Sequence, residues 1–205
     1  MLCGGNNVVD IDLEFPHSYE IDEVPELPGT GRFNAPVLYF PRTETRPEHD
    51  GLWIKMRAAT GKSWVGVFGF GYGSPPAISR VVSTPDRDRV CVVSRGAAYI
   101  VRTDEPDVWE ELDVMPVLDV RTVPEHQLLV LADFVKLIAY GHNQVAWRSP
   151  RLCWDDLRIL NVGSEKIEGV GYDPVNSCDS RFAVDIRTGR SLCPSPVSID
   201  GDPVW

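Results

Sequence analysis

The chain has 205 residues, 43% of them hydrophobic and 24% charged, a composition that excludes disorder over its whole length. The formal charge of −10, from 30 acidic and 20 basic residues, argues against nucleic acid as a partner, because phosphate binding needs a basic surface. The length suffices for one well-cored domain with an additional arm.

The first segment, residues 1–35, is expected to form an acidic, proline-rich N-terminal arm. Its beginning, MLCGGNNVVDIDLEF, lacks the basic region and long apolar core of a secretory signal. No apolar run of the chain approaches the roughly 18–20 residues that span a bilayer. We therefore expect a cytoplasmic protein without a membrane partner.

Residues 36–205 are predicted to form a single all-β domain, because proline and glycine divide this part into short segments rich in Val, Ile, Tyr and Trp. The predicted strands are Val37–Phe40, Leu52–Arg57, Trp64–Phe70, Ile78–Ser83, Arg89–Ser94, Ala97–Arg102, Val117–Val123, Leu128–Ala132, Val135–Tyr140, Val145–Arg148, Leu157–Val162, Lys166–Gly171 and Arg181–Ile186. Turn sequences such as TPDRD, GHNQ and RTGR separate most of them.

Similar segments recur at an interval of 39 positions. The sequence ISRVVSTPDRDRVCVV from Ile78 aligns without gaps with VLDVRTVPEHQLLVLA from Val117, and the same step leads to Ile159. The predicted units lie near residues 36–75, 76–115, 116–154 and 155–194. Units of about 40 residues with three or four antiparallel strands resemble the blades of β-propellers, and this resemblance names no particular family.

The resemblance also accounts for unbroken apolar runs such as Leu128–Ala132, because the middle strands of stacked sheets are covered on both faces. We predict a small propeller-like array of antiparallel sheet units. A β-sandwich or a meander is the alternative. One or two short helices, starting in TDEPDVWEEL and SPRLCWDDL, would favour that alternative.

Two glycine motifs lack the spacing of nucleotide-binding loops. TGKS, residues 60–63, has Met56 where a phosphate-binding loop has its first glycine, so we predict a hairpin turn there. GVFGFGYGSPP also lacks the G-x-G-x-x-G spacing, and it is predicted to be a strand with one bare face. We expect the protein's own backbone to pack there, and a ligand is the alternative.

No motif predicts a metal or cofactor. The cysteines at positions 3, 91, 153, 178 and 193 contain no C-x-x-C pair, which disfavours zinc and favours a reducing compartment. A disulfide between Cys178 and Cys193 stays an open alternative. No G-x-S-x-G elbow or H-E-x-x-H motif is present.

The candidate binding residues combine exposed aromatic, acidic and imidazole groups, which can stack on ligands, bind cations or transfer protons. They are Trp147, Trp154, Asp155, Asp156, His126 and His142. For each, packing or an exposed turn is the competing interpretation. The sequence favours a non-catalytic module that binds a protein partner. The alternatives are a hydrolase or lyase with a site assembled from separate units, and a structural component of an assembly.

Overall fold

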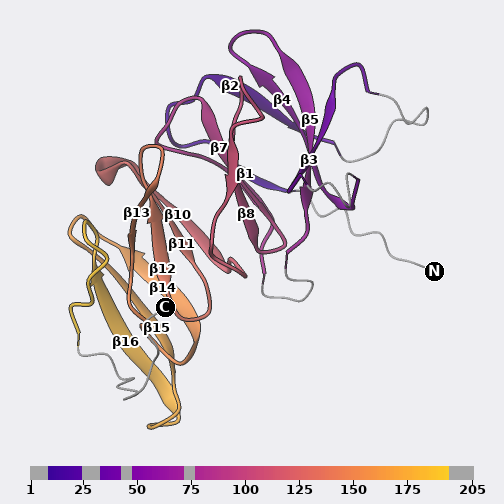
Figure 1. Ribbon diagram of the computed structural model, residues 1–205. Helices are drawn as coiled ribbons and strands as arrows, with labels where there is room; N and C mark the ends of the chain where they lie inside the picture. The colour runs from indigo at the N-terminus through magenta and orange to yellow at the C-terminus, as the bar shows by residue number, and fades with distance from the viewer. Residues whose placement is uncertain (1–8, 25–32, 43–47, 72–76, 194–205) are drawn as a thin grey trace. The chain divides into compact units, whose positions relative to one another are not determined.

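The computed structural model describes residues 9–24, 33–42, 48–71 and 77–193, and this part of the chain is almost entirely β (Figure 1). The strands are β1 (Asp10–Asp12), β2 (Tyr19–Glu23), β3 (Val37–Phe40), β4 (Gly51–Ala58), β5 (Ser63–Gly69), β6 (Arg80–Ser83), β7 (Arg89–Ser94), β8 (Ala97–Arg102), β9 (Trp109–Glu111), β10 (Asp119–Val123), β11 (Leu128–Ala132), β12 (Leu137–Tyr140), β13 (Val145–Arg148), β14 (Asp155–Val162), β15 (Lys166–Asp173) and β16 (Cys178–Asp185). A short 3-10 helix, η1 (Pro124–His126), joins β10 to β11.

The strands form four sheets, which we name by their consecutive strands. The β4–β5 sheet has the order β2-β4-β5-β3, and the β6–β9 sheet has the order β1-β6-β7-β8-β9. The β10–β13 and β14–β16 sheets are antiparallel meanders in which each strand pairs with the next. Two pairings are parallel, β1 with β6 and β3 with β5. The all-β prediction is therefore confirmed.

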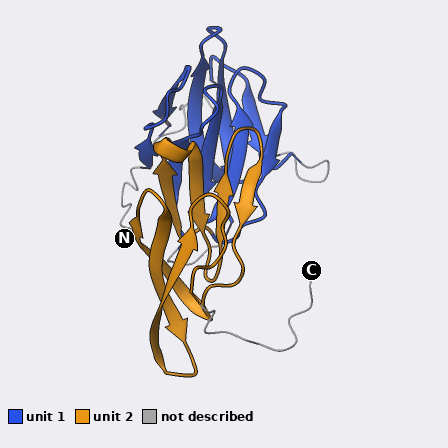
Figure 2. Ribbon diagram, turned by 90° about the vertical axis from the view of Figure 1, so that its left-hand side faces the viewer, with its two compact units in different colours: residues 1–116 blue, residues 117–205 orange. Residues whose placement is uncertain are grey.

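The chain divides into two compact units, residues 1–116 and 117–205, each with two of the sheets (Figure 2). In unit 1, side chains of the β4–β5 sheet such as Ile54 and Phe68 share a core with Val90 and Val92 of β7. In unit 2, Val130 and Ala132 of β11 share a core with side chains of the β14–β16 sheet. Each unit is thus stabilised by its own apolar layer between two sheets.

Both faces of β11 are buried, as its apolar run predicts. Val130 and Ala132 lie in the core of unit 2, while Leu129 and Leu131 on the opposite face are also 0% exposed. In β7, likewise, Val90 and Val92 face the core of unit 1, and Cys91 and Val93 on the opposite face are fully buried. Burying one such aliphatic side chain contributes about 1.5–3 kcal/mol, which explains why these strands do not alternate polar and apolar residues.

Residues that recur at the 39-residue interval lie on strands in the structure, and two tryptophans make similar hydrogen bonds. Val81, Val120 and Ile159 lie on β6, β10 and β14, where they pair with the following strand of the same sheet. Two buried indoles make matching bonds within their units. Trp64 Nε1 donates to the carbonyl of Thr103 directly after β8, at 2.8 Å, and Trp147 Nε1 donates to that of Ile186 directly after β16, at 2.9 Å.

Strands also form where the sequence analysis considered short helices or an arm. The segments TDEPDVWEEL and SPRLCWDDL contain no helix; Trp109–Glu111 forms strand β9 and Asp155 begins strand β14, so the short helices considered with the sandwich or meander alternative do not form. Within residues 1–35, where we expected an arm, β1 pairs with β6 and β2 pairs with β4. Asp10 and Asp12 anchor β1 through ion pairs with Arg80.

No helix in the described part of the chain is long and apolar enough to cross a membrane.

Candidate functional site

The six predicted site residues lie in unit 2, and the histidines are at one end of its strands. His126 ends η1, and its Nε2 lies 2.6 Å from the carbonyl oxygen of Ser164 in the β14–β15 turn. His142 lies exposed in the β12–β13 turn. Trp147 on β13 is only 7% exposed and belongs to the core, so its indole is a packing group and not a ligand-binding surface.

The other three residues lie at the opposite end of β14. Trp154 is 44% exposed, and the guanidinium carbon of Arg151 lies 5.0 Å from its ring centroid. Asp155 begins β14, and its carboxylate accepts a hydrogen bond from the backbone N–H of Asp156 at 2.8 Å. Asp156 adopts a φ of 54° and lies in an irregularity of the β14–β15 pairing.

The structure therefore does not bring the two histidines together with the two aspartates. Asp155 is the first residue of the eight-residue strand β14, and the strand ends two residues before Ser164, the contact of His126. Eight residues of a strand span about 26 Å, which is too far for side chains at its two ends to act on one small ligand. Trp154, Asp155 and Asp156 remain together as an exposed group.

The glycine motifs have structural roles. TGKS lies in the β4–β5 hairpin, where Gly61 has a φ of +81° and the N–H of Ala58 donates to the carbonyl of Lys62 at 2.9 Å. The bare face of the glycine motif is covered by the protein's own backbone: a Cβ added at Gly71 would lie 2.5 Å from the backbone nitrogen of Ala97. These findings confirm the predicted hairpin turn and the predicted packing.

The described cysteines are free thiols: Cys91, Cys153, Cys178 and Cys193. Cys178 and Cys193 therefore form no disulfide in the structure. Burial raises the pKa of the Cys91 thiol to about 12, so this group stays protonated and unreactive at neutral pH. Among the described residues, no group of three or more His, Cys, Asp or Glu side chains could hold a metal ion.

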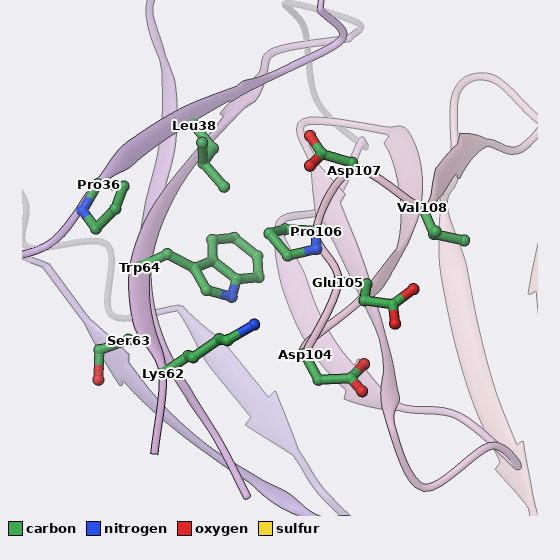
Figure 3. Close-up of a pocket in the computed structure, with 10 residues that line it drawn as sticks. All are labelled: Pro36, Leu38, Lys62, Ser63, Trp64, Asp104, Glu105, Pro106, Asp107 and Val108. Atoms are coloured by element: carbon green, nitrogen blue, oxygen red, sulfur yellow. The ribbon is translucent and has the colours of Figure 1, made fainter. Parts of the chain in front are cut away.

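A pocket of about 530 Å³ lies in unit 1, where β3 and β5 of one sheet face the loop between β8 and β9 of the other (Figure 3). We call it the Trp64 pocket. Its walls are mostly apolar; the lining residues are Pro36, Leu38, Lys62, Ser63, Trp64, Asp104, Glu105, Pro106, Asp107 and Val108. Its volume is in the range of pockets that bind small molecules.

Ion pairs hold the β8–β9 loop at the rim of this pocket. Arg42, two residues after β3, pairs with Asp107 and donates to the carbonyl of Pro106 at 3.3 Å. Arg102 at the end of β8 lies near Asp104 and Glu105 at 3.1 and 3.3 Å. A hydrogen bond with Asp88 and then the charge of Asp104 raise the pKa of the Arg102 guanidinium. The guanidiniums thus connect the loop to the two sheets.

No strand in the described part of the chain pairs with the outer edge of β3, which lies beside the Trp64 pocket. β3 is the last strand of its sheet, and Pro36 and Leu38 bond to β5, as shown by the 2.9 Å bond from the N–H of Val65 to the carbonyl of Pro36. In a parallel ladder the intervening residues, Val37 and Tyr39, direct their backbone groups to the other side. Among the described residues these groups have no hydrogen-bond partner.

A smaller pocket of about 370 Å³ in unit 1 has His49, Tyr99 and Glu111 among its lining residues. The Tyr99 hydroxyl donates to the carbonyl of Gly69 at 3.1 Å, and Nδ1 of His49 lies 3.1 Å from the carbonyl oxygen of Asp50. Both groups therefore already contact backbone atoms. No serine or cysteine nucleophile is among the residues that line this pocket.

Comparisons with known proteins show no family for this chain. No protein-family model matches it, and no curated protein matches it. One similar solved chain comes from a complex of S. cerevisiae dbp5 bound to nup159, gle1, ip6 and adp; it is 9% identical, the alignment covers 89% of this chain and 70% of that chain, and the TM-score is 0.27. A likeness at this level carries no argument about fold or function.

Proposed function

We propose that the chain is a non-catalytic binding module whose partner is another protein. The observation that supports this proposal most directly is the Trp64 pocket, an apolar recess of about 530 Å³ beside the edge of β3 that no described strand covers. Apolar pockets with a few polar groups at the rim are typical of binding sites, and an open strand edge is a common docking element for proteins.

The scaffold in this proposal is the propeller-like array that the sequence predicts. It is supported by the burial of both faces of β7 and β11 and by the matching indole bonds of Trp64 and Trp147. The free thiols suit a reducing compartment, so a cytoplasmic location is part of the same proposal.

The test is capture of a partner by the full chain and by two matched variants. Val108 is 41% exposed in the Trp64 pocket, and Val175 is 82% exposed in the β15–β16 turn of unit 2. The variants Val108→Lys and Val175→Lys make the same chemical change at these two places. We expect proteins captured from the source cells to be lost with Val108→Lys and retained with Val175→Lys, at equal thermal stability of the two variants.

Three results would contradict the proposal. Equal capture by both variants would place the partner elsewhere on the chain. Turnover of a glycoside, lactone or phosphoester by the purified chain, without any captured partner, would favour the hydrolase or lyase alternative. A defined oligomer of the chain alone in light scattering, unchanged by Val108→Lys, would favour a structural component of an assembly.

A further inference from the structure

We infer that the partner contributes an extended segment that adds to the outer edge of β3 as a further strand, with an apolar side chain in the Trp64 pocket and basic residues beside it. This inference rests on the proposed function, and it specifies the chemistry of the partner at the same site. Three features of unit 1 support it: the backbone groups of β3 that have no partner among the described residues, the apolar recess beside them, and the exposed carboxylates at the rim.

The backbone of β3 offers a short ladder for an added strand. Val37 and Tyr39 each present one N–H and one carbonyl at the outer edge, while Leu38 and Phe40 direct theirs to β5. An incoming strand would lie about 4.8 Å from β3 and could form up to about four backbone hydrogen bonds with these two residues. Exposed edges of this kind normally pair or are covered, because their backbone groups are otherwise left without a partner.

The Trp64 pocket provides the place for a side chain of the added strand. Leu38 on β3 and Val108 on the β8–β9 loop are both among its lining residues (Figure 3). Trp64 is itself only 3% exposed, and its indole N–H is already bonded to Thr103. The recess therefore offers apolar contact without a free donor from this indole, which suits an aliphatic side chain.

Two exposed carboxylates at the rim favour a basic segment. Glu105 and Asp107 expose 59% and 83% of their side chains, whereas their partners Arg102 and Arg42 expose only 32% and 34%. The carboxylates therefore face solvent, and the guanidiniums lie beneath them. Exposed ion pairs contribute little to stability, so the carboxylates remain available to a lysine or arginine of the partner. The net charge of −10 adds a long-range attraction for a basic segment.

The probe is a random library of ten-residue peptides displayed on phage, selected on the full chain and counter-selected on the Val108→Lys variant. We expect enrichment of sequences with a central Val, Ile or Leu and flanking Lys or Arg. The best enriched peptide is then synthesised and N-methylated at one position at a time. Methylation should weaken binding by about 10-fold at every second residue, because only alternate N–H groups of an added strand face β3.

Amide hydrogen exchange of the full chain gives an independent readout. Binding of the enriched peptide should slow exchange at Val37 and Tyr39 and leave Leu38, which is already paired with β5, nearly unchanged. The substitution Glu105→Gln should weaken the peptide about 3- to 10-fold at low salt, and Glu165→Gln in unit 2 is its matched control.

The outcomes separate this inference from the proposed function. Peptides that lose binding in Val108→Lys, but show no alternation under N-methylation and no protection of Val37 and Tyr39, would overturn strand addition and leave the binding module intact. Failure to enrich any peptide would also overturn it, while the capture experiment still judges the module. If the chain alone dimerises and Val108→Lys abolishes the dimer, a second copy of the chain occupies the Trp64 pocket. That result would overturn the inference that an extended segment of another protein binds there.

Discussion

The two sheets of unit 2 differ in how many of their faces are buried, although they succeed each other in the chain. In the β10–β13 sheet, every residue of β11 and β12 is buried. In the β14–β16 sheet, buried and exposed residues largely alternate, with Ile167 inside and Lys166 and Glu168 outside. The difference shows that the pattern of apolar residues reports the number of covered faces and not only the presence of a strand.

Ion pairs occupy the exposed face of the β14–β16 sheet. Arg158 pairs with Asp179 across β14 and β16, and the Lys166 ammonium lies 2.7 Å from the Glu168 carboxylate. Water solvates this face, so its strands can carry charges that would be costly in β11. The following predictions test the contrast between doubly and singly buried strands, beginning with the largest expected effect.

The largest effect is expected in thiol reactivity. Cys91 lies fully buried on the doubly buried strand β7, and Cys178 lies exposed at the beginning of β16. We expect Cys178 to react with a maleimide at least about 1,000-fold faster than Cys91, because Cys91 becomes accessible only on unfolding. Peptide mapping by mass spectrometry measures both sites in one sample. Similar rates would show that the second face of β7 is open to solvent.

The next effect is a loss of stability on truncating leucine. Leu131 is 0% exposed on the face of β11 that lies outside the unit 2 core, and Leu160 on β14 is 63% exposed. Leu131→Ala should reduce the free energy of unfolding by about 2–5 kcal/mol, and Leu160→Ala should change it by less than about 0.5 kcal/mol. Urea unfolding measures both. A small loss for Leu131→Ala would refute burial of the second face.

The strands themselves could be predicted from sequence because turn residues and apolar runs are local signals. Val37–Phe40, Leu128–Ala132 and Val145–Arg148 were predicted with the bounds that the structure has. The short strand β2 was not assigned, since it depends on pairing with β4 far along the chain. Local patterns do not specify such long-range pairing.

The candidate site was harder to predict than the strands. Pro36 ahead of β3 is consistent with an edge strand, but nothing near it in sequence indicates that the loop around Pro106 lies opposite. The residues from Asp104 onward carry a local helix-start signal, and that signal concealed their role at the pocket rim. The aspartates and histidines of unit 2 were grouped because they are near in sequence, whereas β14 separates them in space.

A smaller loss of stability is expected when a methyl group is added to the buried face of the β14–β16 sheet. A Cβ added at Gly169 would lie 2.4 Å from the carbonyl oxygen of Arg158, whereas at Gly163 its nearest neighbour would be 3.4 Å away. Gly169→Ala should therefore destabilise the chain by about 1–3 kcal/mol. Gly163→Ala is the matched control and should cost less than about 1 kcal/mol. Equal midpoints in urea would show that β14 can move away from β15 at no cost.

A loss of similar or smaller size is expected for the indole bond of unit 2. Trp147→Phe removes the donor to the Ile186 carbonyl and should cost about 1–3 kcal/mol. Trp154→Phe makes the same change at an indole that is 44% exposed and should cost less than about 0.5 kcal/mol. Thermal unfolding of the two variants side by side provides the measurement. If both lose the same stability, the buried indole bond does not hold the two sheets of unit 2 together.

The smallest effect concerns the exposed face of the β14–β16 sheet. Hydrogen bonds from Lys166 and Asn161 lower the pKa of the Glu168 carboxyl below its ordinary value of 4.5. A carboxyl whose pKa is depressed in the folded state stabilises the fold above the ordinary pKa, and that contribution is lost as the pH falls through the folded-state value. An NMR titration should place the midpoint of Glu168 below 4.5, and Lys166→Gln should raise it. Because the pair is exposed, 0.5 M salt should move the midpoint in the same direction. A midpoint insensitive to both changes would mean that this face is not solvated as the alternating burial of β15 indicates.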